Sequence, residues 1–273
     1  MVTIIVPTDF SATARCALYF AGKMAEGWEE VEIKIVHVFM PAVESEYPNF
    51  VPPVAEYLKV REKMLDEFVK EATAEAIASD SIRVSKELLV GFPADEIARV
   101  ARDADLIVMG TTGDSDILNK IFGSVSSAVA RRADCPVVLV PGEMTFSGFN
   151  HILFASNYES ISPGIMAKLI AFNKPFQACI HFVHVREKKS YERSKETIIR
   201  ELFTEGEPPF AFEMAEVEGD TVDKALNAYV KENQIDLVVM VNQHRSFWDN
   251  FFRRSETRKM ALTTRIPMMV LHL

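Results

Sequence analysis

The chain has 273 residues, of which 48% are apolar and 25% charged, and its net charge is −9. This length fits two domains of about 130 to 140 residues, and the apolar content is enough to offset the entropy of ordering both. The acidic balance excludes a general DNA- or RNA-binding surface, although backbone amides or a local basic patch could still hold an anion.

The cysteines and the apolar runs indicate the compartment. Cys16, Cys135 and Cys179 lack Cys-x-x-Cys spacing, which is typical of buried thiols in a reducing compartment and not of a disulfide framework. The sequence begins almost directly with the apolar run Val2 to Pro7, without the basic segment that opens a signal peptide. No apolar stretch approaches the roughly 18 to 20 residues that a membrane span requires. We therefore expect a cytoplasmic protein with no membrane partner.

Along the first half, short runs rich in valine and isoleucine alternate with longer helix-periodic segments. This alternation is typical of parallel strands buried by crossover helices, so we expect an α/β fold. The predicted strands are 2–7, 31–39, 82–90, 105–110 and 136–140, and the predicted helices are 11–26, 54–79, 94–103 and 124–133. The long helix is the clearest, because one stripe at 3.6-residue spacing is apolar while Glu and Lys fill the other side. That stripe consists of Leu58, Leu65, Phe68, Val69, Ala72 and Ala76.

The second half repeats the order of the first. Four pairs of segments match: Ile4–Pro7 with Ile152–Ala155, Ile35–Val38 with Phe182–Val185, Asp105–Met109 with Asp236–Met240, and, one position out of step, Cys135–Leu139 with Arg265–Met269. We therefore predict two tandem domains, 1–143 and 149–273. They are joined where Pro141, Gly142 and Gly148 interrupt the periodic pattern.

A glycine motif follows the fourth predicted strand of the first half. Gly110, Gly113, Gly123 and Ser124 form the pattern Gly-x2-Gly-x9-Gly-Ser. Glycines reach positive φ and let backbone N–H groups approach phosphate, and a helix N-terminus favours an anion. The same residues could instead shape a turn and an ordinary helix cap. The phosphate interpretation is favoured because the motif and Asp9 both follow strands whose carboxyl ends flank the crevice of an open α/β sheet.

With these motifs the whole chain resembles a tandem member of the universal stress protein family, and specifically its ATP-binding branch, whose signature is the same glycine run. Further matching segments are Pro7-Thr8-Asp9-Phe10-Ser11, Val36-His37-Val38, Gly123-Ser124-Val125-Ser126 and Cys135-Pro136-Val137. The resemblance implies two open parallel five-stranded sheets of order 3-2-1-4-5, flanked by helices and related by an internal pseudo-twofold axis. It also implies pairing of Pro136–Leu139 with Pro267–Val270, so that one chain forms a pseudo-dimer. Two such chains could associate further as a homodimer.

The resemblance also implies a nucleotide site in the first half. Adenine would lie near Thr8, Asp9 and the main chain at Val38, ribose near Asp9 and Gly110, and phosphates on Gly113, Gly123, Ser124 and Val125. The complete predicted binding set is Pro7, Thr8, Asp9, Val38, Met109, Gly110, Gly113, Gly123, Ser124 and Val125. The expected ligand is ATP, AMP or ADP, with Mg²⁺ or Mn²⁺ carried by the nucleotide and no metal held by the protein itself.

The second half departs from this signature. Gly110 is replaced by Val241 and Gly113 by His244. Gly123 is replaced by Ser255 or a neighbour, and Asp9 by Asn157. A valine has difficulty adopting positive φ and places its side chain where phosphate would approach, so we expect nucleotide in the N-terminal domain only. Arg253, Arg254 and Arg258 could form an anion-binding patch or only a solvated helix entrance. The aromatic residues Phe247, Trp248, Phe251 and Phe252 could form an interface or fill the degenerate site.

No catalytic group is apparent. His181 and His184 are three residues apart on a predicted strand, so they point to opposite faces and cannot share one ion. No nucleophile, triad or water-activating base can be placed in one crevice. We therefore expect a stress-response sensor in which ATP biases conformation or partner affinity. The alternatives are a slow ATPase or phosphotransferase using the same loop, and an interaction scaffold that binds no nucleotide.

Overall fold

A computed structural model of the chain describes residues 1–40, 54–77, 79, 81–111, 123–142, 144–155, 162–186, 209–219, 222–242 and 266–272. These residues group into two compact units. The first combines residues 1–135 with 142–146, and the second combines 136–141 with 147–273. Both units contain mostly parallel strands flanked by helices, so the predicted α/β class is confirmed. Within the described ranges, no helix is both long enough and apolar enough to cross a membrane.

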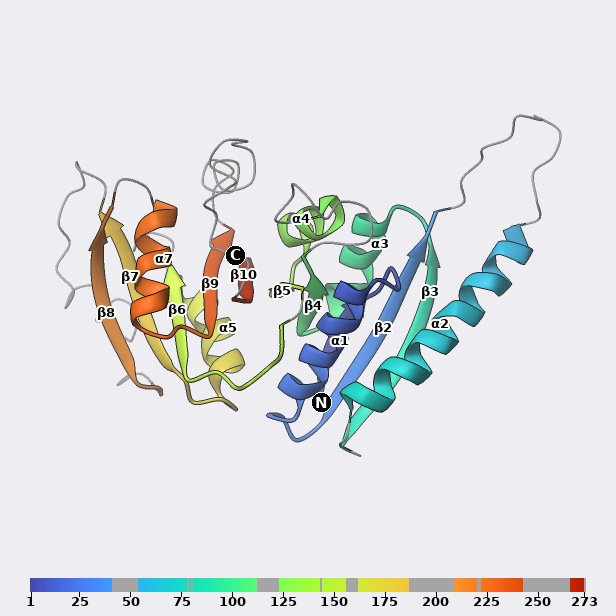
Figure 1. Cartoon of the computed structure of the whole chain (residues 1–273), viewed down its shortest axis with the longest axis horizontal. Helices are drawn as coiled ribbons and strands as arrows, with labels where there is room; N and C mark the ends of the chain where they lie inside the picture. Colours follow the sequence, from blue (N-terminus) through green and yellow to red (C-terminus); the bar gives the residue numbers. More distant parts are fainter. Residues whose placement is uncertain are drawn as a thin grey trace. The chain divides into compact units, whose positions relative to one another are not determined.

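The first unit has four parallel strands in the order β3-β2-β1-β4. They are β1 (Val2–Pro7), β2 (Val31–Phe39), β3 (Ile82–Val90) and β4 (Leu106–Gly110). The helices are α1 (Ala12–Ala25), α2 (Val54–Ala76), α3 (Pro93–Val100) and α4 (Ser124–Arg132), with a 3₁₀ turn at Ala101–Asp103. α1 packs on α2 on one face of the sheet, and α3 packs on α4 on the other (Figure 1). The central strands are therefore covered on both faces, which explains their continuous apolar runs.

The predicted stripe of the long helix is its buried face. Leu65, Phe68, Ala72 and Ala76 are each at most 4% exposed, at the spacing of successive helical turns. The end of this helix comes very close to α1: a Cβ placed on Gly22 would overlap the carbonyl oxygen of Ala76. Glycine at position 22 thus permits the close approach of the two helices.

The second unit has six strands in the order β5-β10-β9-β6-β7-β8. They are β5 (Val137–Val140), β6 (His151–Ala155), β7 (Cys179–Arg186), β8 (Phe212–Glu218), β9 (Leu237–Asn242) and β10 (Met268–His272), with helices α5 (Pro163–Asn173) and α7 (Val222–Glu232). All neighbours are parallel except β5 and β10, which pair antiparallel with Val138 opposite Met269. This ladder places β5, the last strand of the first sequence repeat, in the second compact unit. The predicted domain limits and pseudo-twofold axis stay predictions.

In each repeat, the aspartate just before the fourth strand forms the same pair of hydrogen bonds with the backbone of the first strand. In the first unit, Thr3 N–H donates to Asp105 Oδ2 at 2.8 Å, and Asp105 N–H donates to the carbonyl of Thr3 at 3.0 Å. In the second, His151 N–H donates to Asp236 Oδ2 at 3.0 Å, and Asp236 N–H donates to the carbonyl of His151 at 2.8 Å. The two halves therefore share local bonding as well as element order.

Candidate functional site

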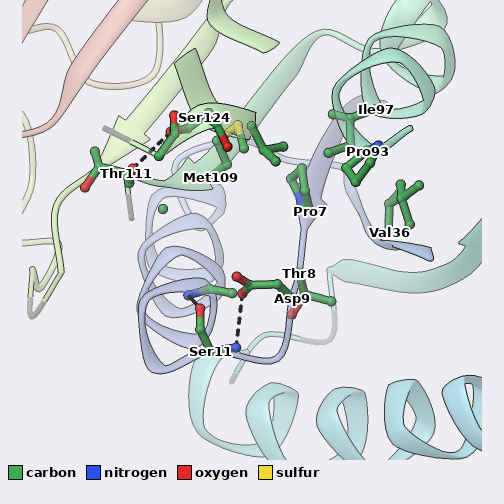
Figure 2. Close-up of a pocket in the computed structure, with 16 residues that line it drawn as sticks. Pro7, Thr8, Asp9, Ser11, Val36, Pro93, Ile97, Met109, Thr111 and Ser124 are labelled. Atoms are coloured by element: carbon green, nitrogen blue, oxygen red, sulfur yellow. Dashed lines mark hydrogen bonds between the residues drawn. The ribbon is translucent and has the colours of Figure 1, made fainter. Parts of the chain in front are cut away.

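A pocket with a volume of about 180 Å³ lies at the carboxyl edge of the first unit's sheet (Figure 2). It is lined by Pro7, Thr8, Asp9, Ser11, Ala14, Val36, Val38, Pro93, Ile97, Met109, Gly110, Thr111, Gly123, Ser124, Val125 and Ser126. Every predicted binding residue except Gly113 is in this set; Gly113 lies outside the described residues. They meet because β1 and β4 are parallel neighbours, so the segments that follow both strands leave the sheet at the same edge.

The turn after β1 holds Asp9 at the rim of the pocket. Phe10 N–H donates to Thr8 Oγ1 at 2.9 Å, and Ser11 N–H donates to Asp9 Oδ1 at 3.1 Å. Ser11 Oγ then caps α1 by accepting from Ala14 N–H at 3.2 Å. These bonds hold Phe10 at φ = 68°, a left-handed conformation that a non-glycine residue adopts only when its surroundings enforce it. This hydrogen-bonded turn therefore also fixes the orientation of the exposed Asp9 carboxylate.

His37 supports this turn from the other side of β2. Its Nδ1–H donates to the carbonyl oxygen of Thr8 at 2.8 Å, and its ring lies 4.2 Å from that of Phe10. Burial is the main cause that lowers the pKa of His37, and Arg61 lowers it further, while the bond to Thr8 and the charge of Asp9 oppose these effects. Nε2 has no hydrogen-bond partner among the described residues. A neutral ring therefore suits this position.

The structure corrects the reason given for two of the glycines. Gly110 has no positive φ, and Gly123 has φ = −64°, which any residue adopts. Instead, a Cβ on Gly110 would come within 2.7 Å of Thr13 Cγ2 and 3.0 Å of the Thr13 carbonyl oxygen. Gly110 thus allows β4 to pack closely on α1. The positive-φ argument against Val241 fails for the same reason, because that residue lies inside the regular strand β9.

The N-terminus of α4 opens into the pocket. Gly123 is its cap residue and supplies no side-chain hydrogen bond, and the first turn contains no acidic residue. Ser126 Oγ donates to the carbonyls of Thr111 at 3.0 Å and Gly123 at 3.1 Å, which fixes the helix start against the end of β4. Ser124 is exposed and Val125 is half-buried. The uncapped amides and the helix dipole together favour an anion at this point.

The opposite walls of the pocket are apolar. Val36 and Val38 come from one face of β2, Met109 from β4, and Pro93 and Ile97 from the start of α3. Figure 2 shows Pro93 and Ile97 on the side of the pocket away from Ser124. The volume is below the roughly 300 Å³ at which pockets for complete small-molecule ligands begin. The described walls therefore leave room for only part of a ligand of drug-like size.

Seven lining residues were not predicted from the sequence: Ser11, Ala14, Val36, Pro93, Ile97, Thr111 and Ser126. Alternation along a strand could have indicated Val36, since it shares a face with the predicted Val38. Pro93 and Ile97 belong to a helix that follows β3, so only the sheet order brings them beside β1 and β4. The replacements His244, Ser255 and Asn157, the three arginines and the aromatic residues predicted near the second-half loop lie outside the described residues.

Comparisons with known proteins agree with this architecture. A family model described as the universal stress protein family matches residues 1–141 and again residues 148–272. A universal stress protein of Methanocaldococcus jannaschii is 30% identical over 146 residues, which cover 50% of this chain and 80% of that protein. One of Mycobacterium tuberculosis is 28% identical over 142 residues, which cover 51% of this chain and 48% of that protein.

A solved structure shares the fold over nearly the whole length. The crystal structure of a universal stress protein from Archaeoglobus fulgidus aligns with a TM-score of 0.71 and 21% identity, covering 99% of this chain and 96% of that chain. At this identity the alignment shows the fold alone. The match in both halves supports the tandem arrangement predicted from the sequence repeat.

Proposed function

The chain belongs to the universal stress protein family, and on that premise we propose that its N-terminal domain, residues 1–143, binds an adenine nucleotide and acts as a cytoplasmic regulatory module. The observation that carries this proposal is one pocket that joins apolar walls to the uncapped N-terminus of α4. A purine needs the first feature and a phosphate needs the second. ATP is the proposed ligand, with AMP and ADP as alternatives and Mg²⁺ or Mn²⁺ carried by the nucleotide.

The pocket supports one orientation of the ligand. The base would lie against the apolar side, between Val38 and Ile97, and the ribose hydroxyls would face the fixed carboxylate of Asp9. The phosphates would then extend toward Ser124 and Val125 at the start of α4. Because the net charge of the chain is −9, local amides and not the overall field must hold these phosphates.

We propose that the second domain, residues 149–273, does not bind nucleotide in the same orientation. Val241 stands at the end of its fourth strand where the first domain has Gly110, and it is 8% exposed. The sequence also has Asn157 and His244 where the first domain has Asp9 and Gly113, so the second domain lacks both the ribose-facing carboxylate and a glycine of the motif. The two domains would then respond as one nucleotide-bound and one nucleotide-free half.

A regulatory role requires only that nucleotide change the relative stability of two conformations or the affinity for a protein partner. A slow ATPase or phosphotransferase is the second candidate, because it would use the same pocket. Among the described lining residues, Asp9 is the only ionisable side chain, and its Oδ1 already accepts from Ser11. This observation favours binding without turnover.

The test begins with mass spectrometry of the small molecules that co-purify with the protein, followed by titration with ATP·Mg²⁺, AMP and adenosine. We expect about one nucleotide per chain. Ser124→Glu should weaken ATP binding by more than about tenfold, because like charges about 4 Å apart repel by about 4 kcal/mol at a protein surface before screening. The acidic residue suits the helix dipole, so the fold should be retained.

Ser124→Gln is the matched control, since it adds similar bulk without charge, and adenosine is the ligand control, since it lacks phosphate. Comparing Ser124→Glu with Ser124→Gln, and ATP with adenosine, separates charge repulsion from blockage of the pocket. No bound or titratable nucleotide would refute the proposal and leave an interaction scaffold. ATP turnover that Gly123→Val abolishes would instead establish the enzymatic candidate.

A further inference from the structure

Three potential metal ligands from two neighbouring strands converge in the second unit. His151 and Cys179 are the first residues of β6 and β7, and the parallel register places them directly opposite each other. His181 follows Cys179 by two residues, so its side chain lies on the same face of β7. The cluster therefore occupies the amino edge of the strands, the edge opposite to the one where α/β sheets of this kind bind nucleotides.

The ligand atoms are already close together. One ligand atom from each of His151, Cys179 and His181 lies within 4.8 Å of the other two. His151 Nδ1 is 3.0 Å from His181 Nε2. In tetrahedral zinc sites with Zn–N bonds of about 2.0 to 2.1 Å, two nitrogen ligands are about 3.3 Å apart. The two rings thus need to separate by only a few tenths of an ångström to hold an ion between them.

We propose that His151 Nδ1, Cys179 Sγ and His181 Nε2 bind one Zn²⁺ ion, with a fourth position left for water. Two imidazoles and one thiolate suit this borderline-soft cation better than Mg²⁺ or Ca²⁺, which prefer oxygen ligands. His151 and Cys179 are half-buried, so an ion can reach them from solvent, whereas His181 is only 2% exposed. The site does not depend on nucleotide binding in the first domain.

The groups around His181 are those that orient a metal-bound histidine. Its other ring nitrogen, Nδ1, is 3.0 Å from Tyr229 Oη on α7 and 3.5 Å from Glu213 Oε2 on β8. Metal-ligating histidines usually donate this second N–H to a carboxylate or another acceptor, which fixes the ring and its tautomer. With Nδ1 protonated by this arrangement, Nε2 presents its lone pair toward His151 and Cys179.

The backbone that carries the cluster is firmly held. Asp236 bonds both the N–H and the carbonyl group of His151, as described above. Cys179 N–H donates to the carbonyl oxygen of Asn150 at 2.8 Å. Ion binding then requires side-chain adjustment, loss of the Cys179 thiol proton to solvent, and a change of the His151 tautomer that moves its ring proton from Nδ1 to Nε2.

The first domain provides an internal comparison. By the sequence repeat and the strand register, Thr3, Glu32 and Lys34 occupy the positions of His151, Cys179 and His181. Lys34 forms a salt bridge with Glu87, and Glu32 accepts a hydrogen bond from Ser85 Oγ. The shared fold therefore does not require metal ligands at these positions, and their presence in the second unit is a property of this half alone.

The test uses the full chain, loaded with Zn²⁺ or Co²⁺ and freed of excess metal by dialysis. We expect one Zn²⁺ per chain, and a Co²⁺ spectrum with a thiolate charge-transfer band. Cys179→Ser should remove that band and lower the Zn²⁺ affinity by at least about 100-fold. His151→Gln should lower the Zn²⁺ affinity by the same factor. Glu213→Gln should weaken binding by about tenfold while the band remains, because only the orientation of His181 is affected.

Cys16→Ser is the matched thiol control, because Cys16 is also half-buried but lies in the first unit. His184→Gln is the matched imidazole control, because residue 184 is on the opposite face of β7 from His181. Both should bind Zn²⁺ as the wild type does. Absence of stoichiometric Zn²⁺ and Co²⁺ binding would overturn the proposal. So would binding that survives both Cys179→Ser and His151→Gln in proteins with a wild-type circular dichroism spectrum.

Discussion

Gly110→Ala tests whether glycine at the end of β4 is needed for packing. The added Cβ would lie 2.7 Å from Thr13 Cγ2 and 3.0 Å from the Thr13 carbonyl oxygen, whereas ordinary van der Waals contacts begin at 3.4 Å. The carbonyl belongs to the backbone of α1, so it cannot rotate away. The Thr13 side chain is β-branched and holds few rotamers in a helix. The helix must therefore move from the strand by several tenths of an ångström.

Such overpacking costs about 1–3 kcal/mol in a folded core, and we expect a loss of this size in the free energy of unfolding of the first unit. The double variant Gly110→Ala/Thr13→Ala removes the contact with Cγ2 but leaves the carbonyl contact. It should therefore recover part of the loss, with a coupling between the two sites of about 0.5–3 kcal/mol. Movement of α1 also shifts Ser11 and Ala14, so ATP affinity should fall.

Denaturant unfolding measures this effect if the signal reports one unit. Trp28 is the only tryptophan in the sequence of the first unit, and Trp248→Phe removes the other from the chain. Fluorescence in that background follows the first unit without the second. Gly142→Ala is the control, because the nearest atom to its added Cβ is Thr13 Oγ1 at 4.0 Å. Gly142→Ala should leave the free energy of unfolding unchanged or raise it by up to about 1 kcal/mol, because alanine restricts the unfolded chain. An unfolding midpoint for Gly110→Ala equal to that of wild type would refute the packing argument.

Two further changes test the first unit with the same fluorescence signal. Gly22→Ala should destabilise it by about 1–3 kcal/mol despite the better helix propensity of alanine, because the added Cβ overlaps the Ala76 carbonyl; an increased midpoint would contradict this close contact. The pKa of His37 is lowered from about 6.5, so its contribution to stability is complete above that pH and is lost as the pH falls through the folded pKa. His37→Gln should flatten the loss of stability below pH 6.5, and an unchanged slope would show that another group titrates.

Local periodicity in the sequence was enough to predict the elements. The valine- and isoleucine-rich runs became β1 to β4, and the apolar stripe ending at Ala76 became the buried face of α2. These features depend on the spacing of residues within one segment, which is readable without any long-range contact. The segment matches between the halves likewise predicted the tandem repeat, and Asp105 and Asp236 form the same bonds in both.

The membership of the candidate site was predictable in part. The order of strands places the segments after β1 and β4 at one edge, so residues at those strand ends, such as Asp9 and Gly110, could be expected together. Ile97 was missed because nothing in its own segment marks it as a lining residue, and Ser126 belongs to the matching segment Gly123–Ser126 but was not among the predicted binding residues. They line the pocket because α3 and α4 both begin at the carboxyl edge of the sheet, beside the ends of β1 and β4.

The sequence by itself determined the α/β class, the repeat and the edge of the sheet at which the pocket forms, because each follows from patterns within short segments. Only the tertiary structure decided that Gly110 serves packing against Thr13, that β5 and β10 pair antiparallel with Val138 opposite Met269, and that His151 lies beside His181. Each of these contacts joins segments that are distant along the chain. Their meeting is set by strand register and helix packing, which no local periodicity encodes.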